Sequence, residues 1–141
     1  LKDRAAVGEA MEKFMERAPK ELAAALPVQR GAGKSADFSR AADAQKRELA
    51  LRYVRLVVGC RPFAAAASFA ARQKDVYEEL CAWLRRYNEE VVKELRHPDN
   101  PAIVEAQFQL AADITALLFS AEEAELLRRR GKAAQSAASA A

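Results

Sequence analysis

The fold is decided by the stretch from Pro62 to Arg96, which reads PFAAAASFAARQKDVYEELCAWLRRYNEEVVKELR. It contains no internal glycine or proline, and we predict one long central helix over about 62–96. Such a helix would be about 50 Å long, whereas a compact domain of this size is only about 37 Å across, so we expect an elongated bundle. The apolar seam of this helix recurs at steps of three and four residues: Tyr77, Leu80, Leu84, Tyr87, Val91 and Leu95.

The composition is that of an all-α protein. Of the 141 residues, 33 are alanine, whereas nine are valine and two are isoleucine. Alanine favours helices, and β-branched residues favour strands. A chain of this length can bury one self-sufficient core. We therefore predict an antiparallel bundle of about five helices that forms a single domain over residues 1–131, with a loop over 27–39 and a flexible alanine and serine tail over 132–141.

Helix-ending residues and apolar spacing predict the other boundaries. A first helix over 2–18 is followed by a short one that begins at Pro19, and a third, capped by Ser39, is expected over about 40–58. Asn100 and Pro101 predict the start of a further helix. Ser120 with Glu123 predicts that the last helix restarts or kinks there, and Gly131 predicts its end. The first helix carries one apolar stripe, of the kind that faces a core: Val7, Met11, Phe14 and Ala18.

Positive charge is concentrated in one segment. Residues 29–61 hold eight basic and three acidic side chains, whereas the whole chain has a net charge of only +3. A basic segment of this kind suits nucleic acid, an anionic surface or an acidic partner, although a solvated helix face is the simpler interpretation. The candidate contact residues in this segment are Arg30, Lys34, Lys46, Arg47, Arg52 and Arg55.

The stretch 63–71 is unusually rich in alanine. Small side chains allow another helix to approach closely, so the segment is either a tight crossing inside the molecule or a docking surface for a partner. For the second alternative the candidate contact residues are Phe63, Ala66, Ala67 and Phe69.

Few residues are available for catalysis or metal binding. His97 is the only histidine and lies in a helix-breaking loop, while Cys60 and Cys81 fall in apolar stretches and are expected to be buried free thiols. We expect no metal site and no cofactor, because the spacing of these three residues matches no zinc pattern. Asp113 lies in an apolar stretch, and we expect it to pair with an arginine or to face outward. The sequence around Lys34 lacks the first glycine and the preceding strand of a phosphate-binding loop.

We therefore expect a non-enzymatic structural or adaptor subunit that contacts other protein subunits in a larger assembly, with self-association as an open alternative. Two other functions remain open: a nucleic-acid-binding domain that uses residues 30–61, and a bundle that holds a small apolar ligand. No segment has the roughly 20 apolar residues that a membrane span needs. The unpaired cysteines favour an intracellular location. Richness in alanine and arginine would suit an organellar protein that has lost its presequence, and equally a protein from a high-GC bacterial genome.

Overall fold

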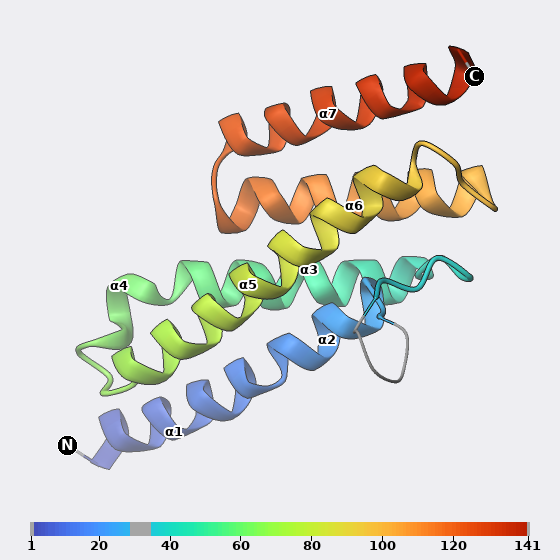
Figure 1. The fold of residues 1–141 in the computed structure, drawn as a ribbon. Coiled ribbons are helices and arrows are strands. Elements are labelled where there is room, and N and C mark those ends of the chain that lie inside the picture. Colours follow the sequence, from blue (N-terminus) through green and yellow to red (C-terminus); the bar gives the residue numbers. More distant parts are fainter. Residues whose placement is uncertain (1, 29–34, 141) are drawn as a thin grey trace.

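The computed structural model describes residues 2–28 and 35–140. This part of the chain is all-α, as predicted, and contains no named strand, only an isolated antiparallel bridge between Val28 and Ala36. The helices, shown in Figure 1, are α1 (Lys2–Glu16), α2 (Ala18–Ala25), α3 (Ala44–Gly59), α4 (Arg61–Ala64), α5 (Ala70–Glu94), α6 (Pro101–Leu118) and α7 (Ala121–Ala140).

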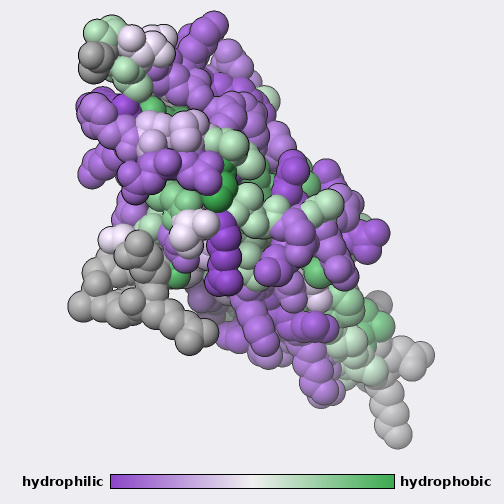
Figure 2. Space-filling model, turned by 90° about the vertical axis from the view of Figure 1, so that its right-hand side faces the viewer, coloured by the Kyte–Doolittle hydropathy of each residue, from purple (hydrophilic) through white to green (hydrophobic). Residues whose placement is uncertain are grey.

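Helix α5 is the central helix of the bundle, as the sequence predicts. It crosses the molecule diagonally in Figure 1 and contacts every other helix among the described residues. Its predicted seam is buried, and Leu80, Leu84 and Val91 have no exposed surface at all. Figure 2 shows that the molecule is clearly longer in one direction than across it. Within the described ranges, no helix combines the length and the apolar character needed to cross a membrane.

The long helix begins at Ala70 rather than at Pro62, so the predicted N-terminal boundary is wrong. Helix α4 ends after one turn, and Ser68 then adopts a left-handed conformation with φ of 64°. The amide of Phe69 donates to the carbonyl of Ala64 over 2.9 Å, which is the hydrogen bond that closes a helix ending in a left-handed residue. This turn directs the Phe69 side chain into the core, where only 2% of its surface is exposed.

The start of α3 also differs from the prediction. The helix begins at Ala44, and the side chain of Asp43 accepts a hydrogen bond from the amide of Lys46 over 2.8 Å. Ser39, the predicted cap, donates from its amide and its hydroxyl to the carboxylate of Asp37 instead. Because these local bonds hold residues 37–39 in a turn, the chain continues to Asp43 before it becomes helical.

Helix α7 continues past Gly131 to Ala140, so the predicted helix end at Gly131 is wrong. Gly131 is buried, and a Cβ atom built on it would lie 2.2 Å from the Cζ atom of Phe108. The glycine is therefore required for close packing of α7 on α6, and not for ending a helix. Farther along α7, Ala134 is buried, and Gln135 donates to the carboxylate of Glu105 on α6. Residues 132–140 thus belong to a packed helix of the domain.

Buried glutamines connect helices that are distant in sequence. The side chain of Gln73 on α5 donates to the carbonyl of Val57 near the end of α3 over 2.9 Å. Gln107 on α6 donates in the same way to the carbonyl of Ala25 at the end of α2 over 3.1 Å. Carbonyl groups in the last turn of a helix lack partners within that helix, so these two side chains satisfy them and fix how the helices meet.

Candidate docking face

The apolar stripe predicted for the first helix faces the core only in part, because Met11 packs against the core and Ala18 is buried, whereas Val7 and Phe14 are exposed. Val7 is 55% exposed and Phe14 is 52% exposed, whereas Met15 is fully buried and Gly8 is buried. At about 100° per residue, Gly8 and Met15 lie roughly 90° around the helix from Val7. The interpretation of Val7 and Phe14 as core residues is therefore wrong. Helix α1 is rotated so that the side that carries Gly8 and Met15 touches the rest of the bundle.

The reason for this rotation is the close approach at Gly8. A Cβ atom on this residue would lie 2.3 Å from the backbone oxygen of Ala67, far inside normal contact distance. Only glycine allows α1 to come so near to the turn between α4 and α5. With Gly8 and Met15 fixed against the bundle, Val7 and Phe14 are left at the surface.

The exposed stripe of α1 continues onto α3. The ring of Phe14 stacks on that of Tyr53, with ring centroids 5.6 Å apart and planes 27° from parallel. On the same side of α3, Leu49 and Leu56 are half-buried, while Tyr53 itself is only 7% exposed beneath the ring of Phe14. Phe63, in the following helix α4, is 67% exposed. We call the surface formed by the exposed Val7 and Phe14 and the partly covered Leu49, Tyr53 and Leu56 the α1–α3 face. Large apolar side chains that remain exposed together on a small protein mark an interaction surface.

Cations lie at the margins of the α1–α3 face. Lys13 and Arg17 are exposed on one flank of the α1 stripe, and neither forms an ion pair with another described residue. On α3, Arg52 lies about 100° around the helix from Tyr53, on the side of Leu49 and Leu56. Its guanidinium is 3.9 Å from the carboxylate of Glu48, with both side chains more than half exposed. An exposed ion pair at this distance is weak, so Arg52 can contact another charge as well.

The predicted basic residues do not converge on one surface. Lys46, Arg47, Arg52 and Arg55 are all exposed on α3, but at about 100° per residue they spread over more than half of its circumference. Glu48 lies between Arg52 and Arg55 on this helical projection. Arg30 and Lys34 lie outside the described residues. Of this group, Arg52 lies at the edge of the α1–α3 face, and Lys46, near the start of α3, lies within about 20° of Tyr53 on the projection.

The alanine-rich segment makes a crossing inside the molecule, the first of its two predicted roles. Ala67 is half-buried and packs against Gly8, and Phe69 is buried in the core, so neither side chain is available to a partner. Ala66 and Phe63 are both exposed. Sequence reasoning missed Val7, Lys13, Phe14 and Arg17 as surface candidates. A glycine inside the helical pattern, Gly8, was the available signal of a close contact on a different side of α1.

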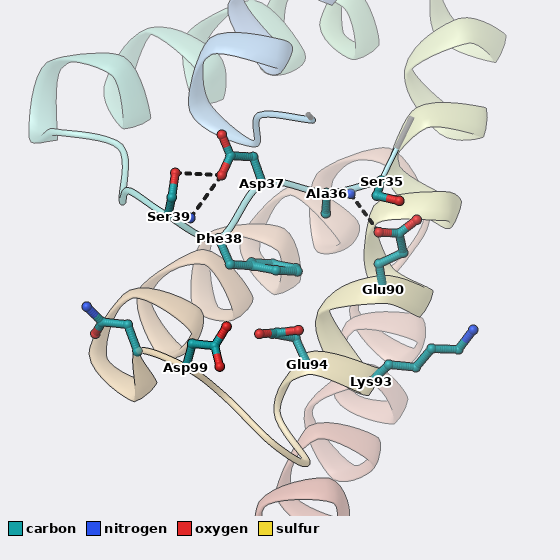
Figure 3. A pocket seen from close by; sticks show the side chains of 10 residues that line it. Ser35, Ala36, Asp37, Phe38, Ser39, Glu90, Lys93, Glu94 and Asp99 are labelled. Atoms are coloured by element: carbon teal, nitrogen blue, oxygen red, sulfur yellow. Dashed lines mark hydrogen bonds between the residues drawn. The ribbon is translucent and has the colours of Figure 1, made fainter. Parts of the chain in front are cut away.

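The structure also contains an acidic hollow that the sequence did not predict. It has a volume of about 610 Å³ and lies between the segment 35–39, the end of α5 and the start of α6. Figure 3 shows that the carboxylates of Glu94 and Asp99 point toward each other near the ring of Phe38. Glu90 accepts a hydrogen bond from the amide of Ala36 over 2.6 Å, which ties the segment to α5. The hollow is open, and its side chains come from three separate parts of the sequence.

The cavities next to the long helix bear on the ligand-binding alternative. The space beside Trp83 has a volume of about 10 Å³, far below the roughly 300 Å³ of a small ligand site. A larger hollow of about 450 Å³ lies between α5 and α7, lined by Phe119, Leu126 and Leu127 among others. Its walls combine buried side chains, such as Thr115 and Leu127, with exposed ones such as Leu126, which is 56% exposed, and the hollow is open to the surface. Among the described residues, the space beside Trp83 is therefore too small for a ligand.

The groups that could support chemistry are separated or unreactive. His97 is exposed, and Asp113 pairs with Arg128 over 3.1 Å at the surface, as predicted. Cys60 and Cys81 are buried free thiols, also as predicted, and burial raises the pKa of each. A thiol with a raised pKa is a poor nucleophile at neutral pH. Within residues 2–28 and 35–140, no three histidine, cysteine or acidic side chains are grouped as a metal site requires.

Comparisons of this chain with protein-family models, with curated proteins and with solved structures found no match. Its function is therefore argued from the geometry of its own residues.

Proposed function

We propose that this protein is a non-enzymatic adaptor subunit that binds a helix of another protein on its α1–α3 face. The observation that supports the proposal most strongly is the exposure of Val7 and Phe14, each more than half accessible although large and apolar. Burying such side chains against a partner is favourable by about 25 cal/mol for each Å² removed from water.

The spacing of the apolar residues favours a helical partner. Val7 and Phe14 are seven residues apart on α1, and the same interval separates Leu49 and Leu56 on α3. Seven-residue spacing keeps side chains in line along one side of a helix, and it is the repeat by which helices pack side by side. Since α1 and α3 run in opposite directions in Figure 1, a third helix can lie along the line between them.

The charges argue against a second copy of this chain as the partner. In a two-fold symmetric dimer the same surface of each copy meets the other. The exposed cations Lys13, Arg17 and Arg52 would then face the same cations across the interface. Like charges placed together in this way disfavour association. A different protein is therefore the better partner.

Purification of the tagged full chain from its own cells tests this proposal. We expect a complex with another polypeptide, and we expect the variant Val7→Glu to lose that polypeptide while keeping its helical content and melting temperature. Val7 is 55% exposed and takes no part in the stacking of Phe14 on Tyr53, so the variant is expected to fold. The matched control is Leu126→Glu, because Leu126 is 56% exposed but lies on α7.

The result that supports the proposal is loss of the companion from the face variant alone, together with mapping of the contact to a helical segment of the companion. A lone monomer would contradict the proposal. So would a companion that the folded face variant retains, or one that the Leu126→Glu control loses equally.

A further inference from the structure

We infer that the helix bound on the α1–α3 face is acidic along its two edges. This inference rests on the proposed function, because it names the chemistry of the partner at the same surface. The geometric observation that carries it is the placement of exposed cations on both sides of the apolar stripe: Lys13 on α1, Arg17 directly after this helix, and Arg52 on α3.

The positions of these cations follow from helix geometry. Lys13 on α1 and Arg17, which directly follows this helix, lie about 80° to 120° to one side of Val7 on the helical projection, next to the exposed stripe. Glu9, Glu12 and Glu16 lie about 140° to 200° from Val7, on the side of α1 opposite the stripe, and Glu16 forms an ion pair with Arg72 of α5 over 3.0 Å. The two cations therefore lie between these glutamates and the exposed stripe.

The structure favours an acidic peptide over the other anionic partners. A nucleic acid would contact the cations through its phosphates, but its backbone offers no apolar surface to cover Val7 and Phe14. An anionic membrane would contact α1 more broadly and would also meet its glutamates, Glu9, Glu12 and Glu16. An amphipathic helix with acidic edges matches both the narrow apolar stripe and its basic margins.

Selection from a displayed library tests the inference. The library holds amphipathic helical peptides of about 20 residues with a fixed apolar stripe and randomised edge positions, and it is selected against the intact chain. We expect aspartate and glutamate to be enriched at the edges of the selected peptides. We expect the triple variant Lys13→Glu, Arg17→Glu, Arg52→Glu to bind these peptides at least about tenfold more weakly, because each reversal turns an attraction into a repulsion.

The control reverses two exposed cations of α7, Arg129→Glu and Lys132→Glu, and is expected to leave peptide affinity unchanged. Raising the salt concentration from about 0.05 to about 0.5 M is expected to weaken binding to the original chain more than to the triple variant. Duplex DNA and vesicles that contain phosphatidylserine are measured in parallel as alternative anionic partners.

The outcomes separate this inference from the proposed function. Selected peptides with neutral or basic edges, or an affinity that the triple variant leaves unchanged, would overturn the acidic partner while the docking face stands. Tighter binding of DNA or of the vesicles, lost in the triple variant, would overturn it as well. If no selected peptide depends on Val7 and Phe14, the docking face itself is overturned.

Discussion

Replacing Gly131 with alanine is expected to destabilise the protein, although the same change in most helices is stabilising. The added Cβ would lie 2.2 Å from Cζ of Phe108 and 2.7 Å from each of its Cε atoms. Carbon atoms normally approach to about 3.5 Å, so the ring or helix α7 must move by roughly 1.3 Å. Phe108 is only 3% exposed, so the ring has core atoms around it instead of free space.

The magnitude follows from two opposing effects. Overpacking a core costs about 1–3 kcal/mol, and a displacement above 1 Å places this site in the upper part of that range. Alanine has a better helix propensity than glycine, and this difference offsets about 1 kcal/mol of the overpacking cost. The net loss is then about 1–2 kcal/mol. With an unfolding entropy of about 2.1 cal/mol/K per residue, the melting temperature should fall by roughly 3–7 °C.

Thermal and urea unfolding of the purified chain, followed by circular dichroism, measure this loss. The matched control is Gly59→Ala, because a Cβ there has no neighbour within 4 Å and the residue is the last one of α3. That variant should be unchanged or slightly more stable. The double variant of Gly131→Ala with Phe108→Leu should be more stable than the sum of the two single changes predicts, since the smaller side chain makes room. A Gly131→Ala protein as stable as the original would refute the packing of α7 on α6.

Three further changes test other parts of the fold. Gly8→Ala should cost about 1–3 kcal/mol and speed proteolysis of α1, since the backbone oxygen of Ala67 lies 2.3 Å from the new Cβ and cannot rotate away; a neutral effect would contradict the rotation of α1. Ser68→Gly should raise stability by about 0.5–1 kcal/mol in thermal unfolding, because φ is 64° at this residue, and a loss would argue against the turn. A hydrogen bond from Arg130 lowers the pKa of Glu89 below its ordinary value of 4.5, so this pair stabilises the protein above that pH and is lost as pH falls through the lowered pKa. Both side chains are about half exposed, so we expect Glu89→Gln to remove only about 0.2–1 kcal/mol at pH 7 and almost nothing at pH 2, and equal losses at both pH values would contradict the pairing.

The parts of the fold that the sequence predicted correctly are those set by local chemistry. Asn100 caps α6 through a bond from the amide of Ile103, and Pro101 occupies the first position of that helix. Ser120 accepts from the amide of Glu123 in the same manner at the start of α7. Caps of this kind depend on residues within one turn, so they can be recognised without knowing what the helix packs against.

The wrong boundaries come from contacts between distant parts of the chain. Nothing near Ser68 in the sequence breaks a helix, and the break forms where Phe69 enters the core and Ala67 meets Gly8. Glycine is common at helix ends, but Gly131 lies inside α7 against the ring of Phe108. In both cases a tertiary contact outweighs the local preference of one residue, which is at most about 1–2 kcal/mol.

The candidate site was predicted only in part for the same reason. Arg52 was a candidate from the sequence and lies at the margin of the α1–α3 face, and the candidate Phe63 is exposed on α4. Phe14 was assigned to an ordinary apolar stripe, because spacing alone shows that a stripe exists and not which way it faces. The direction is set by Gly8, whose close contact rotates α1.

The most direct test of the docking face is site-specific photo-crosslinking in the cells that make this protein. A photoreactive phenylalanine analogue is placed at position 14, and at position 126 as the control, since both native side chains are large, apolar and more than half exposed. The account predicts a crosslink from position 14 to a helical segment of a different polypeptide, and none to that polypeptide from position 126. A crosslink from position 14 only to copies of this chain, or no crosslink at all, would contradict it.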